Sequence, residues 1–115
     1  MSTDGRISLT LWRWQRRSAL LLAPLLVFHV AYQYFYVGMD AISFDTVSDK
    51  LQFALFIVVD LLLLAAVAVH AFTGLRSIAL DYTSAPGSIR AITTALVLAF
   101  LLTVVYAVAA LIYFL

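Results

Sequence analysis

Three long runs of apolar residues, separated by short polar segments, constrain this chain more than any other feature. The runs cover residues 18–37, 51–75 and 91–115. Each holds roughly 20 residues or more, enough for an α-helix to cross about 30 Å of hydrocarbon. Lipid offers no hydrogen-bond partners, so a single run must satisfy its own backbone groups, and only a helix does so. The runs therefore predict an all-α membrane protein with three transmembrane helices.

The composition supports the same class. Of the 115 residues, 65% are hydrophobic and 11% are charged, and the mean hydropathy is +1.07. A soluble domain of this size has too little interior to bury so much apolar surface. The chain has no cysteine, which excludes disulfides, iron–sulfur ligation by this chain and c-type haem attachment. The sequence has no stripe of basic residues of the kind that binds nucleic acid, so this function has no support.

We expect residues 1–115 to form a single membrane domain, with helices at about 12–37, 51–76 and 89–115. Residues 38–50 and 76–90 are expected to be loops, and Pro86 with Gly87 marks a turn in the second. Pro24 predicts a kink in the first helix. The first run is long and no small-residue cleavage pattern follows it, which argues against a signal peptide.

The basic residues predict how the chain is oriented. Four arginines precede the first apolar run and two flank the second connector: Arg6, Arg13, Arg16, Arg17, Arg76 and Arg90. Lys50 is the only cation of the first connector, which is otherwise acidic. The positive-inside rule places the N-terminus in the cytoplasm and the C-terminus outside, in a multi-pass protein of the cytoplasmic (inner) membrane. Aromatic residues near the run ends predict an interfacial belt: Trp12, Trp14, Tyr32, Tyr34, Tyr36 and Tyr113.

Three ionisable residues, His29, Asp60 and His70, lie well inside the apolar runs. Such groups are costly in lipid and usually face the interior of a helix bundle. For Asp60, a structural carboxyl bonded to another helix is favoured over a carboxyl on a proton path. Two histidines at this depth suggest haem, because neutral imidazole is a good axial iron ligand. A lone buried histidine is nevertheless more often a hydrogen-bonded interior residue.

The segment that follows His70 strengthens the ligand interpretation. It reads HAFTGLRSIALDY over residues 70–82. Gly74 lies one turn after His70 on the same face, where a missing side chain lets a flat macrocycle or a neighbouring helix approach. Asp81 lies eleven residues after His70, about three turns, so it returns to the histidine face if the helix continues that far. Tyr82 follows Asp81 at the membrane boundary.

This stretch resembles the second helix of the small membrane anchor subunits of succinate dehydrogenase and fumarate reductase, the complex II family. Those subunits are three-helix proteins of about this length. Their second helix carries a haem b histidine, a glycine one turn later, and Asp-Tyr after the helix. His70, Gly74, Asp81 and Tyr82 match this pattern. Arg17 and Ser18 are similar to an Arg-x-Ser element of the companion subunit, although here the two residues are adjacent.

The resemblance implies a role in electron transport. His70 would ligate the iron of haem b, Gly74 would pack against the haem, and Asp81 and Tyr82 would bind a quinone, with Arg17 and Ser18 as further candidates. Asp81 could position Tyr82 or pair with Arg76. A flavoprotein subunit and an iron–sulfur subunit would carry the FAD and the clusters, and a second anchor subunit would supply the opposite haem ligand. This chain would catalyse nothing alone.

His29 raises the question of a second haem. It lies about 16 Å from the start of the first run at Ser18, whereas His70 lies about 8 Å from Leu75, so the two are not expected to share one iron. The resemblance allows one haem or two, and the other interpretation of His29 is a hydrogen-bonded residue near Asp60. Two further alternatives are a b-type cytochrome subunit of another quinone oxidoreductase and a cofactor-free membrane scaffold or transporter.

Overall fold

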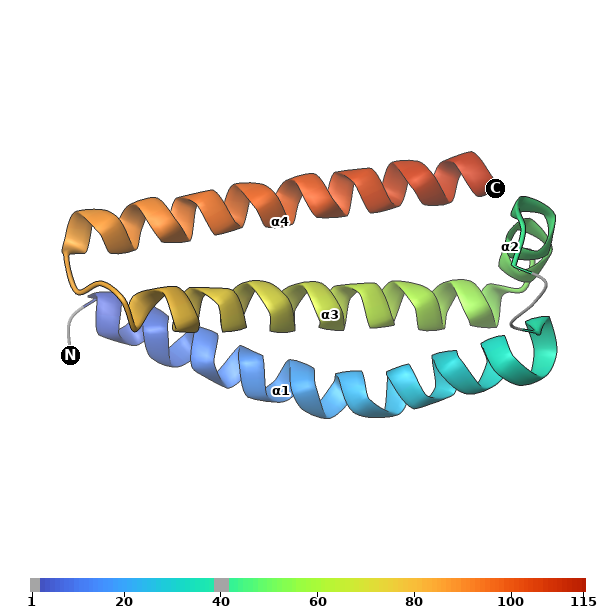
Figure 1. The fold of residues 1–115 in the computed structure, drawn as a ribbon, viewed down its shortest axis with the longest axis horizontal. Coiled ribbons are helices and arrows are strands. Elements are labelled where there is room, and N and C mark those ends of the chain that lie inside the picture. The colour runs from blue at the N-terminus through green and yellow to red at the C-terminus, as the bar shows by residue number, and fades with distance from the viewer. Residues whose placement is uncertain (1–2, 39–41) are drawn as a thin grey trace.

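The computed structural model describes residues 3–38 and 42–115, and all of its long elements are helices (Figure 1). The elements, in chain order, are α1 (Thr3–Tyr32), a π-helical turn η1 (Gln33–Val37), α2 (Phe44–Leu51), α3 (Ala54–Leu80) and α4 (Pro86–Phe114). Three segments are long and apolar enough to span a membrane: Gly5–Val37, Ala54–Leu80 and Pro86–Phe114. No strand occurs among the described residues. The prediction of an all-α protein with three membrane-spanning helices is confirmed.

Each long helix extends beyond its apolar run at one end, although α3 begins at Ala54, three residues after the start of its run. The first begins at Thr3, not at about residue 12, and the second continues to Leu80, not to about 76. Hydropathy marks only the apolar part of a helix that lies in the hydrocarbon, whereas the backbone hydrogen bonds of the helix can continue into polar sequence. The third helix begins at Pro86, which occupies the first turn, where a missing N–H costs no hydrogen bond.

The connector between the first two spans holds a short helix, α2, that was predicted as loop. Ser43 caps it: its side chain accepts a hydrogen bond from the Thr46 backbone N–H at 3.2 Å, and the Ser43 N–H donates to Thr46 Oγ1 at 2.9 Å. This reciprocal pair is a capping box in which Thr replaces the usual Glu or Gln. The sequence signal was therefore present but weak.

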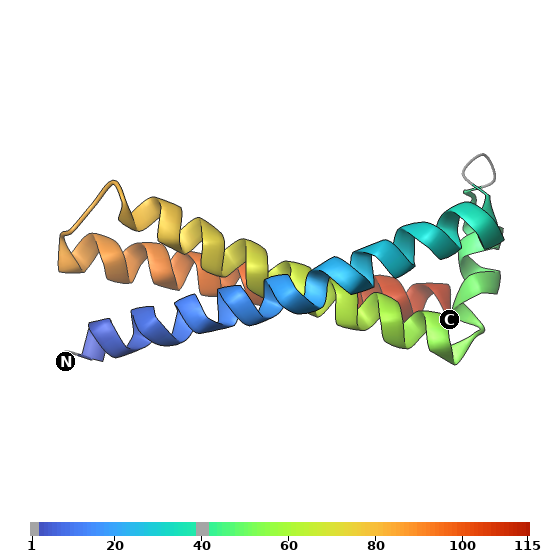
Figure 2. The ribbon, with the colours of Figure 1, turned by 90° about the horizontal axis from the view of Figure 1, so that it is seen from below.

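Helix α3 is the central helix of the bundle. It contacts both α1 and α4, which lie on either side of it in Figure 1. Helix α1 is curved in that view and crosses α3 diagonally in Figure 2. Pro24 lies inside α1 and removes one hydrogen bond from its ladder, which accounts for a bend.

Most of the large apolar side chains face outward, and the buried positions of α3 include the small residues Ala66 and Ala68. No described residue of α4 is buried. This pattern is the reverse of a soluble fold and suits helices that pack through small residues while lipid or partner helices cover the outside.

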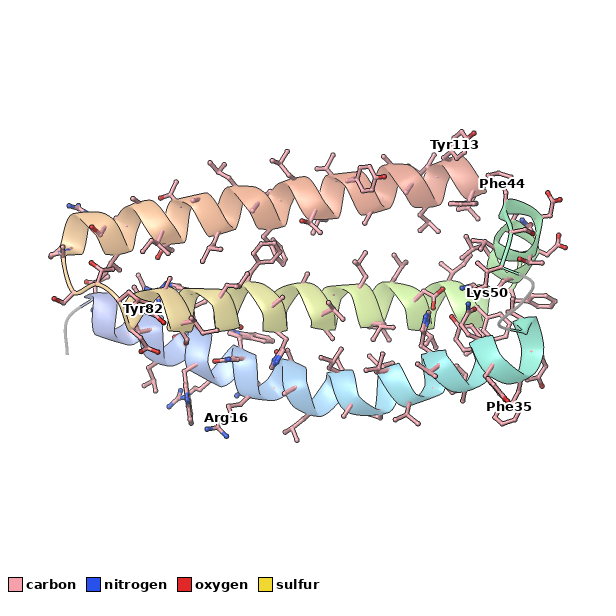
Figure 3. The ribbon with its side chains drawn as sticks, viewed as in Figure 1. Arg16, Phe35, Phe44, Lys50, Tyr82 and Tyr113 are labelled. Carbon is pink, nitrogen blue, oxygen red and sulfur yellow. The ribbon has the colours of Figure 1, made fainter. Side chains whose placement is uncertain are left out.

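The bundle has two chemically distinct halves. The arginine half holds the N-terminus and the connector between α3 and α4, and the lysine half holds α2 and the C-terminus (Figure 1). Figure 3 shows Arg16 and Tyr82 in the first half, and Lys50, Phe44 and Tyr113 in the second. The two termini therefore lie at opposite ends, as an odd number of spans requires.

Candidate functional site

His70 lies on α3 where that helix packs against α1. Its Nδ1 is 3.2 Å from the Gln15 carbonyl oxygen and 3.5 Å from Ser18 Oγ. The buried Ser18 hydroxyl itself donates to the Gln15 carbonyl at 2.9 Å. Nε2 of His70 makes no hydrogen bond to any residue of the described ranges 3–38 and 42–115. One ring nitrogen is thus held by α1 and the other is available to a ligand.

An open groove of about 760 Å³ runs along the surface between α1 and α3 beside this ring. Its lining residues include His70, Gly74, Ser77 and Asp81 from α3. A Cβ built on Gly74 would lie 3.2 Å from the side-chain nitrogen of Gln15. Gly74 therefore leaves room for the Gln15 side chain of α1, and its expected packing against a haem stays a prediction.

Asp81 and Tyr82 follow directly after α3. Because α3 continues to Leu80, Asp81 caps the helix and lines the same groove as His70, as its spacing predicted. Tyr82 does not line the groove. It lies at the end of the bundle, where 87% of its surface is exposed (Figure 3). The His70 groove thus opens at an end where an acid and a phenol stand side by side.

Arg76 does not pair with Asp81. Arg76 is buried, with 7% of its surface exposed. Its Nε donates a hydrogen bond to Thr93 Oγ1 at 2.9 Å, and a terminal guanidinium nitrogen donates one to Ser8 Oγ at 3.4 Å. Five residues of α-helix turn the chain by about 140° past a full turn, so the two side chains leave α3 on different sides. Arg76 instead joins α3 to α4 and α1.

Arg17 and Ser18 lie level with His70, not with Tyr82. Ser18 contacts the His70 ring, and the exposed Arg17 places its guanidinium 5.6 Å from the centre of the Trp14 ring. Twelve residues of helix separate His70 from Tyr82, a rise of about 18 Å. A quinone contact by Arg17 or Ser18 stays a prediction. At this distance, one quinone head cannot contact Tyr82 and also reach Arg17 or Ser18.

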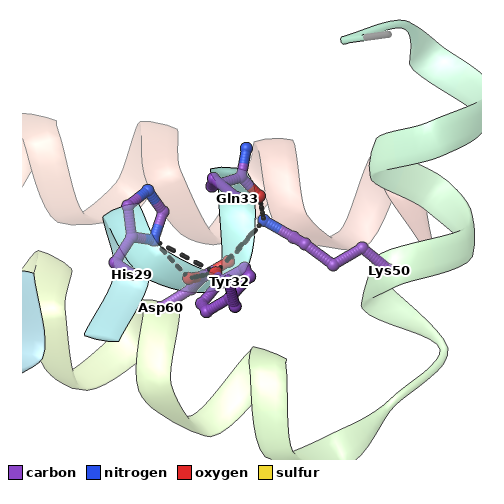
Figure 4. Close-up of polar contacts among 5 residues, drawn as sticks. All are labelled: His29, Tyr32, Gln33, Lys50 and Asp60. Atoms are coloured by element: carbon purple, nitrogen blue, oxygen red, sulfur yellow. Dashed lines mark hydrogen bonds and ion pairs between the residues drawn. The ribbon is translucent and has the colours of Figure 1, made fainter. Parts of the chain in front are cut away.

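A second polar cluster lies in the lysine half, around Asp60 (Figure 4). Its carboxylate accepts from His29 Nδ1 at 2.9 Å, pairs with Lys50 Nζ at 2.9 Å and accepts from the Tyr32 hydroxyl. Lys50 Nζ also lies 3.4 Å from Gln33 Oε1. We call these five residues the Asp60 cluster. It joins α1, η1, α2 and α3.

The Asp60 cluster agrees with the expected contact between Asp60 and another helix, and it adds three residues: Tyr32, Gln33 and Lys50. Asp60 was expected to be a carboxyl bonded to another helix, and it is. Tyr32 was assigned to the interfacial aromatic belt, yet it is 4% exposed, and its ring packs at a tilt against Phe56, with 4.6 Å between the ring centres. The spacing of His29 and Tyr32, three residues apart on one face, was the available signal. Nothing in the sequence indicated that Lys50 reaches Asp60.

No group of three or more potential metal-ligating side chains occurs within residues 3–38 and 42–115. The two histidines are also far apart along the bundle, each with its own partners. Axial ligation of haem needs only one imidazole from a chain. The arrangement at His70 therefore suits a ligand whose other side belongs to another helix.

The chain was compared with known protein families. The family model of the succinate dehydrogenase/fumarate reductase transmembrane subunit matches residues 3–111. The chain belongs to this family. Comparison with curated proteins gave no match. As a complex II membrane subunit, the chain is a multi-pass membrane protein that works with catalytic partner subunits.

The resemblance of residues 70–82 to complex II anchor subunits implies haem b, and the residues of this chain fit it. Nδ1 of His70 lies at a carbonyl oxygen, which fixes the tautomer that leaves Nε2 unprotonated for iron. The groove beside the ring leaves one side open. Gln15, whose amide lies against Gly74, is a flexible side chain on the rim of that groove.

Proposed function

We propose that this chain is the haem b-binding membrane anchor subunit of a succinate:quinone oxidoreductase. In this role it holds the flavoprotein and iron–sulfur subunits at the membrane and forms part of the quinone site. The observation that carries the proposal is the His70 ring, fixed at Nδ1 by the Gln15 carbonyl and facing a groove that continues to Asp81. The family match favours this function over an unrelated cytochrome, a scaffold or a transporter.

The task of this chain at the haem is to present one imidazole. The Gln15 carbonyl oxygen accepts a hydrogen bond from Nδ1–H, so the lone pair of Nε2 is left for the ligand. When bound, haem b supplies a one-electron carrier inside the bilayer. A second anchor subunit would supply the other haem ligand from the open side of the groove.

The quinone contact is assigned to the end of α3 in the arginine half. The exposed Tyr82 hydroxyl is free to donate a hydrogen bond to a quinone carbonyl. The adjacent Asp81 carboxylate can accept and pass on protons at that boundary. The positive-inside rule puts this half at the cytoplasmic face, so an iron–sulfur subunit docked there would deliver electrons next to Tyr82.

The decisive experiment is replacement of His70 in the purified complex. His70→Leu removes the ligand, so the reduced-minus-oxidised haem spectrum and the haem content should change or disappear. His70→Met keeps a weaker iron ligand and should retain haem with an altered spectrum. Leu61→Ala, at an exposed position of the same helix, is the control and should match wild type. Unaltered haem in an assembled His70→Leu complex would refute the assignment.

A second hypothesis is that His29 ligates a second haem in the complex. Its Nδ1 is held by Asp60, and Figure 4 shows its other ring nitrogen pointing away from that carboxylate. A carboxylate at Nδ1 is a common support for a metal-ligating histidine. The same hydrogen bonds also suffice to hold the ring without haem. The haem count of the complex distinguishes the two.

A further inference from the structure

Ser18 lies against the hydrogen bond that holds His70. Its hydroxyl donates to the Gln15 carbonyl oxygen at 2.9 Å, and His70 Nδ1 lies 3.2 Å from the same oxygen. Ser18 Oγ and His70 Nδ1 are 3.5 Å apart. Ser18 is 6% exposed, so bulk water has little access to these groups. Two side-chain donors, one from α1 and one from α3, therefore converge on a single carbonyl of α1.

The Gln15 carbonyl is a crowded acceptor. It lies inside α1, where helix geometry already gives it the backbone N–H four residues further along. A carbonyl oxygen has two lone pairs, so the helix N–H, the Ser18 hydroxyl and the His70 N–H must share them. The Ser18 bond is the shorter of the two side-chain bonds. Sharing the acceptor with this hydroxyl therefore weakens the bond that His70 makes to it.

The strength of that bond bears on His70 as an iron ligand. A hydrogen bond from the second ring nitrogen of a histidine raises the basicity of the imidazole toward a metal. Hydrogen bonding around the axial ligands is one of the ways in which a protein sets the potential of a haem. The Gln15 carbonyl belongs to the backbone, so a substitution at residue 15 does not remove it. A neighbouring donor such as Ser18 can still change how strongly it accepts from His70.

We propose that Ser18 is a positioning residue that sets the strength of the hydrogen bond between His70 and Gln15 and, through it, the redox potential of the haem. The inference rests on the proposed function, because it takes His70 as an axial ligand. The Ser18 hydroxyl draws part of the accepting capacity of the carbonyl away from Nδ1–H. The imidazole is then a weaker electron donor, which favours ferrous over ferric iron. Ser18 thus makes the haem easier to reduce.

The contacts of Ser18 favour this role over two others. Serine hydroxyls in helices often bond a carbonyl of the preceding turn, but here the same carbonyl also holds a histidine of another helix. A quinone would have to draw the hydroxyl away from that carbonyl at an almost fully buried position. The 3.5 Å contact between Nδ1 and Ser18 Oγ is at the limit of hydrogen bonding. Removing that contact should matter less than freeing the carbonyl.

The test is a potentiometric titration of the haem in the intact purified complex, followed by visible spectroscopy. Ser18→Ala and Ser18→Val remove the hydroxyl, whereas Ser18→Thr keeps it in a side chain of the same shape as valine. With the carbonyl left to His70, the first two variants should hold haem at a more negative midpoint potential. The ratio of ferric to ferrous haem at a fixed potential should rise about two- to fivefold, the effect of part of one hydrogen bond. Ser18→Thr should stay close to wild type.

Thr103 provides a matched control outside the site. Its hydroxyl donates to the Ala99 carbonyl of its own helix, α4, at 2.8 Å. Thr103→Val removes the same type of bond and should leave the potential of the haem unchanged. An equal shift in Thr103→Val or in Ser18→Thr would show that the Ser18 hydroxyl has no specific effect, and it would overturn the proposal.

The outcomes separate this inference from the proposed function. A wild-type complex without haem would refute both together. Unchanged potentials in haem-loaded Ser18→Ala and Ser18→Val complexes, or a shift to more positive potential, would refute the inference alone. Haem loss from both variants would make Ser18 a structural residue of the pocket and count against it too. Slower quinone reduction at an unchanged potential would make Ser18 a quinone contact instead.

Discussion

The two histidines show how neighbours decide what one residue type can do. Both use Nδ1 for a hydrogen bond inside the chain, His70 to a backbone carbonyl and His29 to a carboxylate. In each case Nε2 is the nitrogen left for an external ligand. The two differ in setting: His70 borders a groove that leads to Asp81, whereas His29 belongs to the Asp60 cluster.

At Tyr82, loss of one hydroxyl should separate quinone chemistry from succinate oxidation. We expect Tyr82→Phe to slow quinone reduction about 10- to 100-fold if the phenol donates to a quinone carbonyl. Succinate oxidation with a soluble artificial acceptor should stay near the wild-type rate, because that route does not pass Tyr82. Steady-state assays with both acceptors measure the two rates. Equal quinone rates for variant and wild type would exclude Tyr82 as a contact.

At His29, the haem stoichiometry of the complex is the decisive quantity. If His29 ligates a second iron, the wild-type complex holds two haems and His29→Leu holds one. Pyridine haemochrome analysis against protein concentration provides the count. A single haem in wild type, retained by the variant, would make His29 a purely hydrogen-bonded residue of the Asp60 cluster.

At the scale of elements, the Asp60 cluster ties the short helix α2 to the spans. Lys50 is the only member from α2, and its side chain is 10% exposed next to an Asp60 side chain that is 24% exposed. Ser48 adds a link from α2 to the carbonyl of Phe114 on α4 at 3.3 Å. Helix α2 is thus a closure at the lysine end, not a free loop.

Removing the carboxylate should loosen that closure. Asp60→Asn keeps the shape but leaves Lys50 without its anion, and we expect a loss of about 2 kcal/mol, discounted for partial exposure. The thermal unfolding midpoint of the complex should fall accordingly. Asp49→Asn, at an exposed site on α2, removes the same charge and should change the midpoint little. Equal effects of both variants would show that the cluster contributes no specific stability.

For the whole molecule, charge and hydrophobicity are arranged along and across the bundle. The arginines lie in one half, and the outer surface between the ends is apolar. Such a body is stable only in lipid or against partner helices. The basic half is the expected cytoplasmic side, where the catalytic subunits of the complex would dock.

The orientation can be measured directly because the chain has no cysteine. We expect Ser84→Cys, in the exposed connector before α4, to react with a membrane-impermeant maleimide only from the cytoplasmic side. Asp49→Cys on α2 should react only from the outside. Labelling of intact cells, compared with inverted vesicles, separates the two faces, and detergent-solubilised protein shows that both thiols are reactive. The reverse labelling pattern would invert the topology.

The sequence determined the class of fold and the residues that α3 contributes to the candidate site. Three apolar runs left helices as the only option in lipid, and the spacing from His70 through Gly74 to Asp81 fixed a shared helix face, because both follow from local backbone geometry. The family pattern in those residues agreed with the family model.

Only the tertiary structure decided which helices supply the partners. Local periodicity says which way a side chain leaves its own helix, but not which residue stands opposite on another. The Gln15 carbonyl at His70, the turn of Arg76 toward Thr93 and Ser8, and the reach of Lys50 to Asp60 all depend on the crossing and the vertical register of α1, α3 and α4. Those quantities are set by packing over the whole length of the helices, which no local pattern encodes.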